Sequence, residues 1–297
     1  MRDLYAVVLA GGSGRRLAAV TERLTGRPTP KQYCAFGSRR TLLQETLGRL
    51  VPLAPPDRTT VVVLESHLGM AGEQLAPFPE TTVLAQPRDC GTGVGLLRAL
   101  VHVLGRDPRA LVLVSPSDHG IRDHPTFERG IAAACAAADL ASAVLLGVEA
   151  DEPRTDYGWI VPGAEVAPGV RRVLAFVEKP GPEQAEDLAA RGGLFSTMVL
   201  VARVRALLGL FERARPGLVA LFEAVEALPP PAREIHLRRA YALGASCDFS
   251  RDILAGATDL AVVHWPAGLG WTDLGTPERL ARWLGRDAAA PREHTHA

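Results

Sequence analysis

Leu9-Ala-Gly-Gly-Ser-Gly-Arg-Arg-Leu17 is the most informative stretch of this sequence, together with Pro30-Lys-Gln-Tyr33, which follows it closely. The apolar run at residues 4–9 predicts a buried strand, so the glycines fall in the turn after that strand. Backbone N–H groups in such a turn approach phosphate oxygens because no side chains intervene. Two arginines of the stretch and Lys31 add cationic donors. The pattern predicts a site for a nucleoside triphosphate.

Two common phosphate-binding motifs do not fit this stretch. Its spacing differs from that of a P-loop, and a dinucleotide fingerprint would need a glycine where Leu17 stands. A glycine-rich turn alone is also compatible with a plain tight turn. The Pro-Lys-Gln segment favours the nucleotide interpretation.

Composition excludes several classes of partner. The chain has 297 residues, 47% of them hydrophobic, with 33 basic and 33 acidic residues and a formal net charge of zero. No global field attracts nucleic acid or an anionic membrane, so we expect neither as a partner. Four dispersed cysteines predict reduced thiols. With no membrane-spanning stretch and no leader pattern before the first strand, we expect a cytoplasmic protein.

Apolar runs alternate with amphipathic stretches in the first half of the chain. The runs that predict strands are residues 4–9, 60–64, 82–85, 110–115 and 143–148. The stretches that predict helices are residues 41–50, 91–104 and 127–138. This alternation predicts a Rossmann-like α/β fold, a mostly parallel mixed sheet flanked by helices, with ligands at the carboxyl ends of the strands.

The pattern changes from about residue 151. Residues 158–161 and 170–177 predict a hairpin, and a strand at residues 194–202 precedes several helices that extend to residue 243. Pro229-Pro-Pro231 predicts a stiff loop between two of those helices. Residues 287–297 lack periodicity and predict a disordered tail.

Six further segments complete a resemblance to the sugar-nucleotide pyrophosphorylases, and within them to the mannose-1-phosphate guanylyltransferases. They are Gln86-Pro-Arg-Asp-Cys-Gly-Thr92, Ser115-Pro-Ser-Asp-His119, Thr155-Asp-Tyr-Gly-Trp159, Phe176-Val-Glu-Lys-Pro180, Asp248-Phe249 and Gly270-Trp-Thr-Asp-Leu-Gly275. The resemblance implies one nucleotidyltransferase domain over residues 1–286, with a nucleotide-binding half at about 1–150 and a sugar-binding lobe at about 151–286. The family often carries a further C-terminal module, and we expect only the core here.

The resemblance implies that GTP and a sugar 1-phosphate, above all mannose 1-phosphate, give a GDP-sugar and pyrophosphate. In-line attack on the α-phosphorus requires two positioned anions and neutralisation of the leaving group. By motif position, Arg16 and Lys31 act on the triphosphate, Lys179 acts on the sugar phosphate, and Asp118 and Asp273 hold one Mg²⁺. The alternatives are surface cations, a helix cap for Asp118 and a turn for Asp273.

The resemblance also implies further contacts to the nucleotide, made by the glycine-rich stretch, the start of the second predicted helix region and the end of a strand. These residues are Leu9, Ala10, Gly11, Gly12, Ser13, Gly14, Arg15, Gln86, Pro87, Gly91, Thr92 and Ser117. Gly91 and Thr92 are equally compatible with capping a helix, whose positive end would favour an anion.

On the sugar side, the resemblance implies close backbone approach at Gly158, a hydroxyl acceptor at Glu178 and a shaping role for His119, because imidazole is a poor Mg²⁺ ligand. Glu178 is also compatible with ordinary surface charge. Where the family usually reads Trp-Asn-Ser-Gly, this chain reads Phe195-Ser-Thr-Met198. The Ser196 hydroxyl replaces an amide, so we expect relaxed or shifted selectivity among hexose and cyclitol 1-phosphates.

Other interpretations stay open at this point. A cytidylyltransferase of isoprenoid precursor synthesis shares the glycine-rich loop and Pro-Lys-Gln-Tyr, but its His-Asp-Ala-Ala-Arg-Pro is absent. A regulatory homologue would bind sugar nucleotide without turnover, since a fold alone does not prove activity. The sequence leaves the sugar and a homodimer open.

Overall fold

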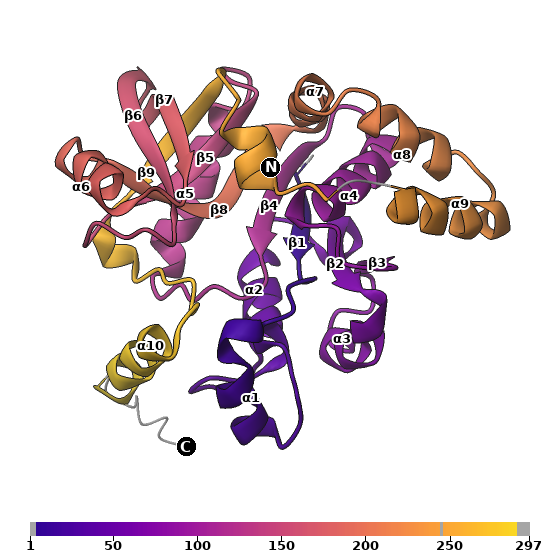
Figure 1. Ribbon diagram of the computed structural model, residues 1–297, viewed down its shortest axis with the longest axis horizontal. Coiled ribbons are helices and arrows are strands. Elements are labelled where there is room, and N and C mark those ends of the chain that lie inside the picture. Colours follow the sequence, from indigo (N-terminus) through magenta and orange to yellow (C-terminus); the bar gives the residue numbers. More distant parts are fainter. Residues whose placement is uncertain (1–3, 244–245, 290–297) are drawn as a thin grey trace.

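The computed structural model describes residues 4–243 and 246–289, the last four by backbone alone. Within this part, one mixed sheet carries helices on both faces (Figure 1), with the strand order β3-β2-β1-β4-β8-β5-β9-β7-β6. The strands are β1 (Leu4–Leu9), β2 (Thr59–Leu64), β3 (Thr82–Gln86), β4 (Leu111–Pro116), β5 (Ala143–Glu149), β6 (Gly158–Ala167), β7 (Val170–Glu178), β8 (Leu194–Arg203) and β9 (Leu260–Trp265).

Helices cover both faces and one end of the sheet. The α-helices are α1 (Ala18–Thr25), α2 (Leu42–Leu50), α3 (Leu68–Leu75), α4 (Thr92–Arg106), α5 (His124–Ala136), α6 (Pro182–Ala190), α7 (Val204–Ala214), α8 (Leu218–Glu226), α9 (Pro230–Leu243) and α10 (Pro277–Ala289). The short helical turns are η1 (Arg15–Leu17), η2 (Lys31–Tyr33), η3 (Pro56–Arg58), η4 (Glu65–His67), η5 (Phe249–Leu254) and η6 (Ala267–Leu269).

The predicted α/β fold with a mixed sheet is confirmed. Strands β3, β2, β1 and β4 are parallel neighbours, as the strand and helix alternation predicts. Strand β8 then lies antiparallel between β4 and β5, and β5 is parallel to β9. In the pairing of β1 with β4, Leu9 lies opposite Pro116. The glycine-rich stretch and the segment from Ser117 therefore leave the sheet at the same edge.

Alternating residues of β1 enter two different cores. Val7 packs with residues of α4, α7 and α8 on one face, and Val8 packs with residues of α2 and α5 on the other. A third, smaller cluster joins η1 to the start of α10 through Leu17, Leu274 and Leu280. Figure 1 shows α10 and α1 at the same end of the molecule. This cluster holds the C-terminal helix beside the glycine-rich loop.

Two details differ from the sequence-based expectation. Pro230 and Pro231 do not form a loop but begin α9, because the first helical turn needs no N–H from these positions. Helix α10 continues to Ala289, so the first residues of the predicted tail are helical; residues 290–297 lie outside the described part. All four cysteines are free, as predicted. No described helix has the length and apolarity needed to cross a membrane.

Candidate active site

Three glycines shape the loop after β1, each for a different reason. Gly14 has a φ of 64°, and a Cβ there would lie 3.0 Å from the backbone N of Lys31. A Cβ on Gly11 would lie 2.9 Å from Nε2 of the buried Gln86. Gly12, by contrast, has nothing within 4 Å of its Cβ position and lines an open pocket of about 280 Å³. The loop therefore exposes backbone to a pocket at Gly12, where an anion can approach.

Gln32 holds this loop from behind. Its Nε2 donates to the carbonyls of Ala10 at 3.0 Å and Gly12 at 2.8 Å, and the Tyr33 hydroxyl donates to Ala10 at 3.3 Å. These bonds explain why Pro-Lys-Gln accompanies the glycine-rich stretch: the second segment fixes the shape of the first. Gln32 was not predicted as a site residue, although its place between Lys31 and Tyr33 was the available signal.

Lys31 connects two segments that are far apart in the sequence, those of Asp118 and Asp273. Its buried Nζ lies 3.2 Å from Asp118 Oδ2 and donates to the carbonyls of Asp273 at 2.5 Å and Leu274 at 3.3 Å. The structure therefore brings three predicted residues together. All three ammonium donors have acceptors, so Lys31 must exchange one of them to contact a phosphate.

A backbone pairing explains how Asp118 and Asp273 meet. Gly120 N donates to Thr272 O at 2.8 Å, and Thr272 N donates to Gly120 O at 3.0 Å. This pair joins the segment that follows β4 to the segment that follows β9. Each aspartate stands within two residues of the pair, so the backbone fixes their separation.

The carboxylate of Asp273 is nearly saturated by its neighbours. Oδ1 accepts from the Tyr157 hydroxyl at 3.0 Å, Gly275 N at 3.0 Å and Arg279 Nη1 at 3.1 Å. Oδ2 accepts from Arg279 Nη1 at 3.2 Å. Burial alone would raise the pKa of Asp273, but nearby positive groups, including Arg279 and Lys31, lower it below its usual value. Asp273 is therefore a carboxylate with room for one further contact at Oδ2.

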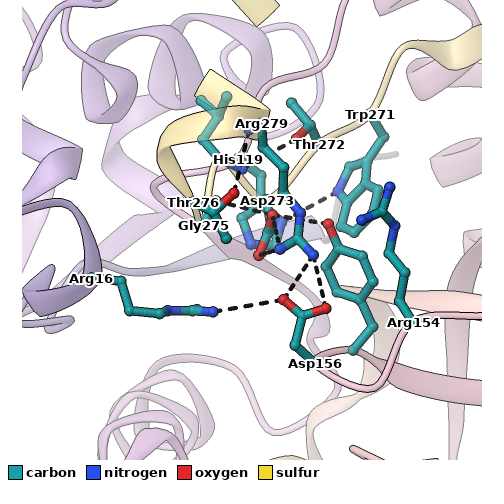
Figure 2. A network of polar contacts seen from close by, with 12 residues as sticks. Arg16, His119, Arg154, Asp156, Trp271, Thr272, Asp273, Gly275, Thr276 and Arg279 are labelled. Carbon is teal, nitrogen blue, oxygen red and sulfur yellow. Dashed lines mark hydrogen bonds and ion pairs between the residues drawn. The ribbon is translucent and has the colours of Figure 1, made fainter. Parts of the chain in front are cut away.

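Arg279 joins this carboxylate to the glycine-rich loop through Asp156 (Figure 2). Its Nη2 donates to both Asp156 oxygens, at 2.8 and 2.7 Å, and its guanidinium lies 4.4 Å from the centre of the Tyr157 ring. Arg16 Nη1 lies 3.9 Å from Asp156 Oδ2 and is mostly exposed. The network thus links α10, the segment before β6 and η1.

Asp156, Tyr157 and Arg279 were not predicted as individual site residues. The first two lie in the quoted stretch from Thr155 to Trp159, which was a usable signal. Nothing in the sequence marks Arg279 as a site residue, because an arginine near the start of an amphipathic helix is ordinarily a surface residue. Only the folded chain buries it between two carboxylates.

The carboxylates differ in how well they fit Mg²⁺. Asp118 lines the open pocket beside Gly12, with Lys31 at 3.2 Å and His119 Nε2 at 3.8 Å. In Asp273, only Oδ2 has room for a further contact, such as one to a metal ion. The described residues contain no cluster of three or more His, Cys, Asp and Glu that could hold a metal. Magnesium needs few carboxylates when phosphate oxygens complete its shell, so the fit rests mainly on Asp118.

His119 follows Asp118 in the chain, has 13% of its side-chain surface exposed and packs against Trp271. Its Nδ1 accepts from Trp271 Nε1 at 3.3 Å, and the two rings meet edge to face with centres 5.5 Å apart. Burial lowers the pKa of His119, which favours the neutral imidazole that this hydrogen bond requires. These contacts suit the predicted shaping role.

Three residues predicted on the sugar side converge. A Cβ on Gly158 would lie 2.8 Å from Glu178 Oε2 and 3.4 Å from Ser196 Cβ. Burial raises the pKa of Glu178, and Lys179 Nζ lies 3.2 Å from its Oε1. Gly158 directly follows Tyr157, whose hydroxyl reaches Asp273. The sugar-side cluster (Gly158, Glu178 and Ser196) is therefore connected to the phosphate side.

Three non-glycine residues of the described chain have positive φ: Lys179 (50°), Met198 (59°) and Leu274 (48°). Lys179 is itself a predicted site residue, Leu274 follows Asp273, and Met198 lies two residues after Ser196. Such strained backbone concentrates at functional sites. Met198 occupies the position of the family's glycine and keeps the left-handed conformation that glycine adopts most easily. The Ser250 hydroxyl donates to its Sδ at 3.2 Å.

The predicted base-binding residues have structural partners. Gly91 is the residue before α4 and packs against the Cys247 carbonyl, where a Cβ would collide. Thr92 Oγ1 accepts from Phe249 N at 3.0 Å, and Ser117 N donates to Leu9 O at 3.1 Å. The capping alternative therefore accounts for Gly91. A contact of these residues, or of Pro87 and Ser13, with the nucleotide stays a prediction.

Comparison with known proteins agrees with this geometry. Xanthan biosynthesis protein XanB of Xanthomonas campestris pv. campestris is 30% identical over 99% of this chain. Mannose-1-phosphate guanylyltransferase ManC of Salmonella typhimurium is 30% identical over 92% of it. The chain spans 62% of the XanB protein and 58% of the ManC protein.

A solved structure, described as mannose-1-phosphate geranyltransferase from Thermus thermophilus, superposes with a TM-score of 0.82 and 26% identity. The match covers 97% of this chain and 80% of that one. Residues 5–287 match the Nucleotidyl transferase family. The loop geometry, the paired strand ends and these matches agree, and the chain belongs to the nucleotidyl transferase family.

Proposed function

We propose that this chain transfers a guanylyl group from GTP to a sugar 1-phosphate, first of all mannose 1-phosphate, and releases pyrophosphate. One observation carries the proposal: a hydrogen bond of Tyr157 links two sets of residues. The first is the phosphate loop around Gly12 with Lys31, and the second is the sugar-side cluster. Tyr157 joins them, since its hydroxyl donates to Asp273 while the next residue, Gly158, belongs to the cluster. The name of the ManC relative supports the choice of guanine and mannose.

The chain's own residues supply the positioning that nucleotidyl transfer needs. The open backbone at Gly12 would receive phosphate oxygens. Arg16 is 62% exposed and only loosely paired with Asp156 at 3.9 Å, so it can turn from Asp156 to the polyphosphate at little cost. Lys31 sits deeper and would neutralise charge on the leaving pyrophosphate. On the other side, Lys179 would hold the sugar phosphate and Glu178 a hydroxyl.

Magnesium is the cofactor that we propose. Bound to phosphate oxygens, it would neutralise charge that develops during the transfer. Asp118 would hold it, because Asp118 lines the pocket beside the phosphate loop. Asp273 would contribute Oδ2, which accepts one hydrogen bond, from Arg279. Arg279 would keep Asp273 ionised and fixed in orientation.

The test is pyrophosphate release in a matrix of GTP, ATP, CTP and UTP against mannose, glucose and inositol 1-phosphates, with Mg²⁺. We expect the highest kcat/KM for GTP with mannose 1-phosphate. A clear preference for another pair would reassign the substrates while keeping the reaction class. Tight nucleotide binding with no turnover for any pair would favour a regulatory homologue instead.

A further inference from the structure

A second pocket, distinct from the phosphate loop, has four arginines among its twelve lining residues. It has a volume of about 730 Å³ and lies between the loop after η2, helix α2, the segment after His119 and helix α10. It shares no lining residue with the pocket at Gly12. Its arginines are Arg39, Arg40, Arg49 and Arg122. The proposed reaction uses none of them.

Arg49 is the feature of this pocket that needs an explanation. Its side chain belongs to α2 and is only 5% exposed. It forms no ion pair within 4.0 Å among the described residues, and the negative charge that acts on it is that of Glu45, four residues earlier in α2. Its Nη2 donates to Thr46 Oγ1 at 3.1 Å, while its Nε is buried without a partner. Its guanidinium also lies 5.4 Å from the centre of the Phe127 ring. A buried cation with so few acceptors is costly unless an anion compensates it.

The rest of the lining adds positive charge. Arg39 and Arg40 are exposed at the mouth, and Arg122 packs over the Trp283 ring at 3.9 Å. Glu45 is the single carboxylate among the lining residues, and its Oε1 already accepts from a serine hydroxyl at 2.5 Å. Three positive charges, those of Arg39, Arg40 and Arg49, thus stand against the one negative charge of Glu45 in the lining. The pocket therefore has an excess of positive charge.

We propose that this pocket binds a small phosphorylated metabolite. Arginine forks match phosphate oxygens two at a time, so Arg49 at the base and Arg40 at the mouth would hold the phosphate. The volume lies in the range of small-molecule sites and exceeds what a bare ion needs. Trp283 and Phe36 supply apolar walls for an organic portion. The proposal is independent of the catalytic assignment.

Calorimetric titration with inorganic phosphate and with glucose 6-phosphate, at constant ionic strength, tests the proposal. The background is Lys31→Met, which we expect to weaken binding at the phosphate loop. In that background we expect saturable binding at one site, weakened at least tenfold by Arg49→Met and by Arg39→Ser/Arg40→Ser. Arg205→Met, which removes an exposed arginine of α7, should leave the affinity unchanged.

Arg39→Ser/Arg40→Ser changes only exposed residues. It therefore still tests the proposed phosphate site if Arg49→Met fails to fold. Melting temperatures without ligand add a second readout. An uncompensated buried charge predicts that Arg49→Met melts no lower than its parent, because a similar apolar side chain replaces a costly ion. Unchanged affinity in both pocket variants would overturn the proposal, as would the loss of all binding in Lys31→Met alone.

Discussion

At the scale of one residue, the chain has Met198 at a position where the family usually has glycine. The backbone there has a φ of 59°, which costs an L-residue roughly 1 kcal/mol or more and glycine little. We predict that Met198→Gly is more stable than Met198→Ala by about 1 kcal/mol. This reverses the usual order of glycine and alanine. Urea unfolding of both variants measures the difference, and an alanine variant as stable as the glycine variant would show that the strain is absent.

Glu178 gives a prediction about pH. Its pKa is raised in the folded protein, mainly by burial, from an ordinary value of 4.5. Above 4.5 the native state therefore binds more protons than the unfolded state, so this group reduces stability as pH rises through the folded pKa. We expect Glu178→Gln to raise Tm at pH 8, with a gain that disappears near pH 4.

We expect Glu178→Gln to lower activity although it raises Tm. The KM for the sugar 1-phosphate should increase, because the amide is a weaker acceptor than a carboxylate. Equal Tm values for wild type and variant at pH 8 would contradict the burial argument. An unchanged KM would remove Glu178 from the sugar site.

At the scale of elements, the phosphate loop offers a matched pair of glycines. Gly14→Ala places a Cβ 3.0 Å from the Lys31 backbone at a φ of 64°, so we expect a loss of about 1–2 kcal/mol of stability. Gly12→Ala meets no neighbour and should leave stability unchanged. It should instead raise KM for the triphosphate, because the methyl group fills the space left for phosphate. Chemical denaturation and steady-state kinetics separate the two effects, and a similar loss of stability in both variants would refute this division.

Helix α10 is held to the body of the protein by Arg279. Arg279→Met leaves Asp156 and the buried Asp273 without their shared partner, so we expect a loss of about 3 kcal/mol of stability. Arg279→Lys should recover little, because an ammonium cannot bridge both carboxylates with paired bonds. Adding Asp156→Asn to Arg279→Met should restore part of the loss. Denaturant unfolding of the variants measures this, and additive effects of the two substitutions would exclude the coupling.

The sequence predicts an element well when neighbouring residues determine it, and poorly when distant residues do. The strand that ends at Leu9 and the helix that starts after Thr41 follow from local patterns, and the structure confirms both. Pro230 was misplaced because prolines suit both loops and first helical turns. The insertion of β8 between β4 and β5 has no local signal, since the partner of a strand depends on the whole sheet.

The same distinction applies to the site. Motif position assigns Gly158 and Glu178 to the same side of the site, and the structure places these two residues next to each other. Motif position does not predict that Arg279 donates to both carboxylate oxygens of Asp273, because that contact depends on how α10 packs. Whether the grouped residues act as predicted is left to experiment.

At the scale of the whole molecule, one sheet carries both sets of site residues. The phosphate loop follows β1, Asp118 follows β4 and Asp273 follows β9, while the sugar-side cluster comes from β6, β7 and β8. The pairing of Gly120 with Thr272 connects the first half of the chain to the last described elements. The site can therefore form only when distant segments have docked, and activity should be lost together with tertiary structure.

We propose that this site transfers a nucleotidyl group with Asp118 at the reacting phosphates. The most direct test of this proposal is GDP-mannose formation, followed by chromatography, from GTP and mannose 1-phosphate with Mg²⁺ in wild type and Asp118→Asn. We predict turnover in the wild type, its loss in excess EDTA, and a drop of at least about a hundredfold in kcat for the variant with an unchanged Tm. A folded Asp118→Asn variant with wild-type kcat would exclude Asp118 from the reacting phosphates.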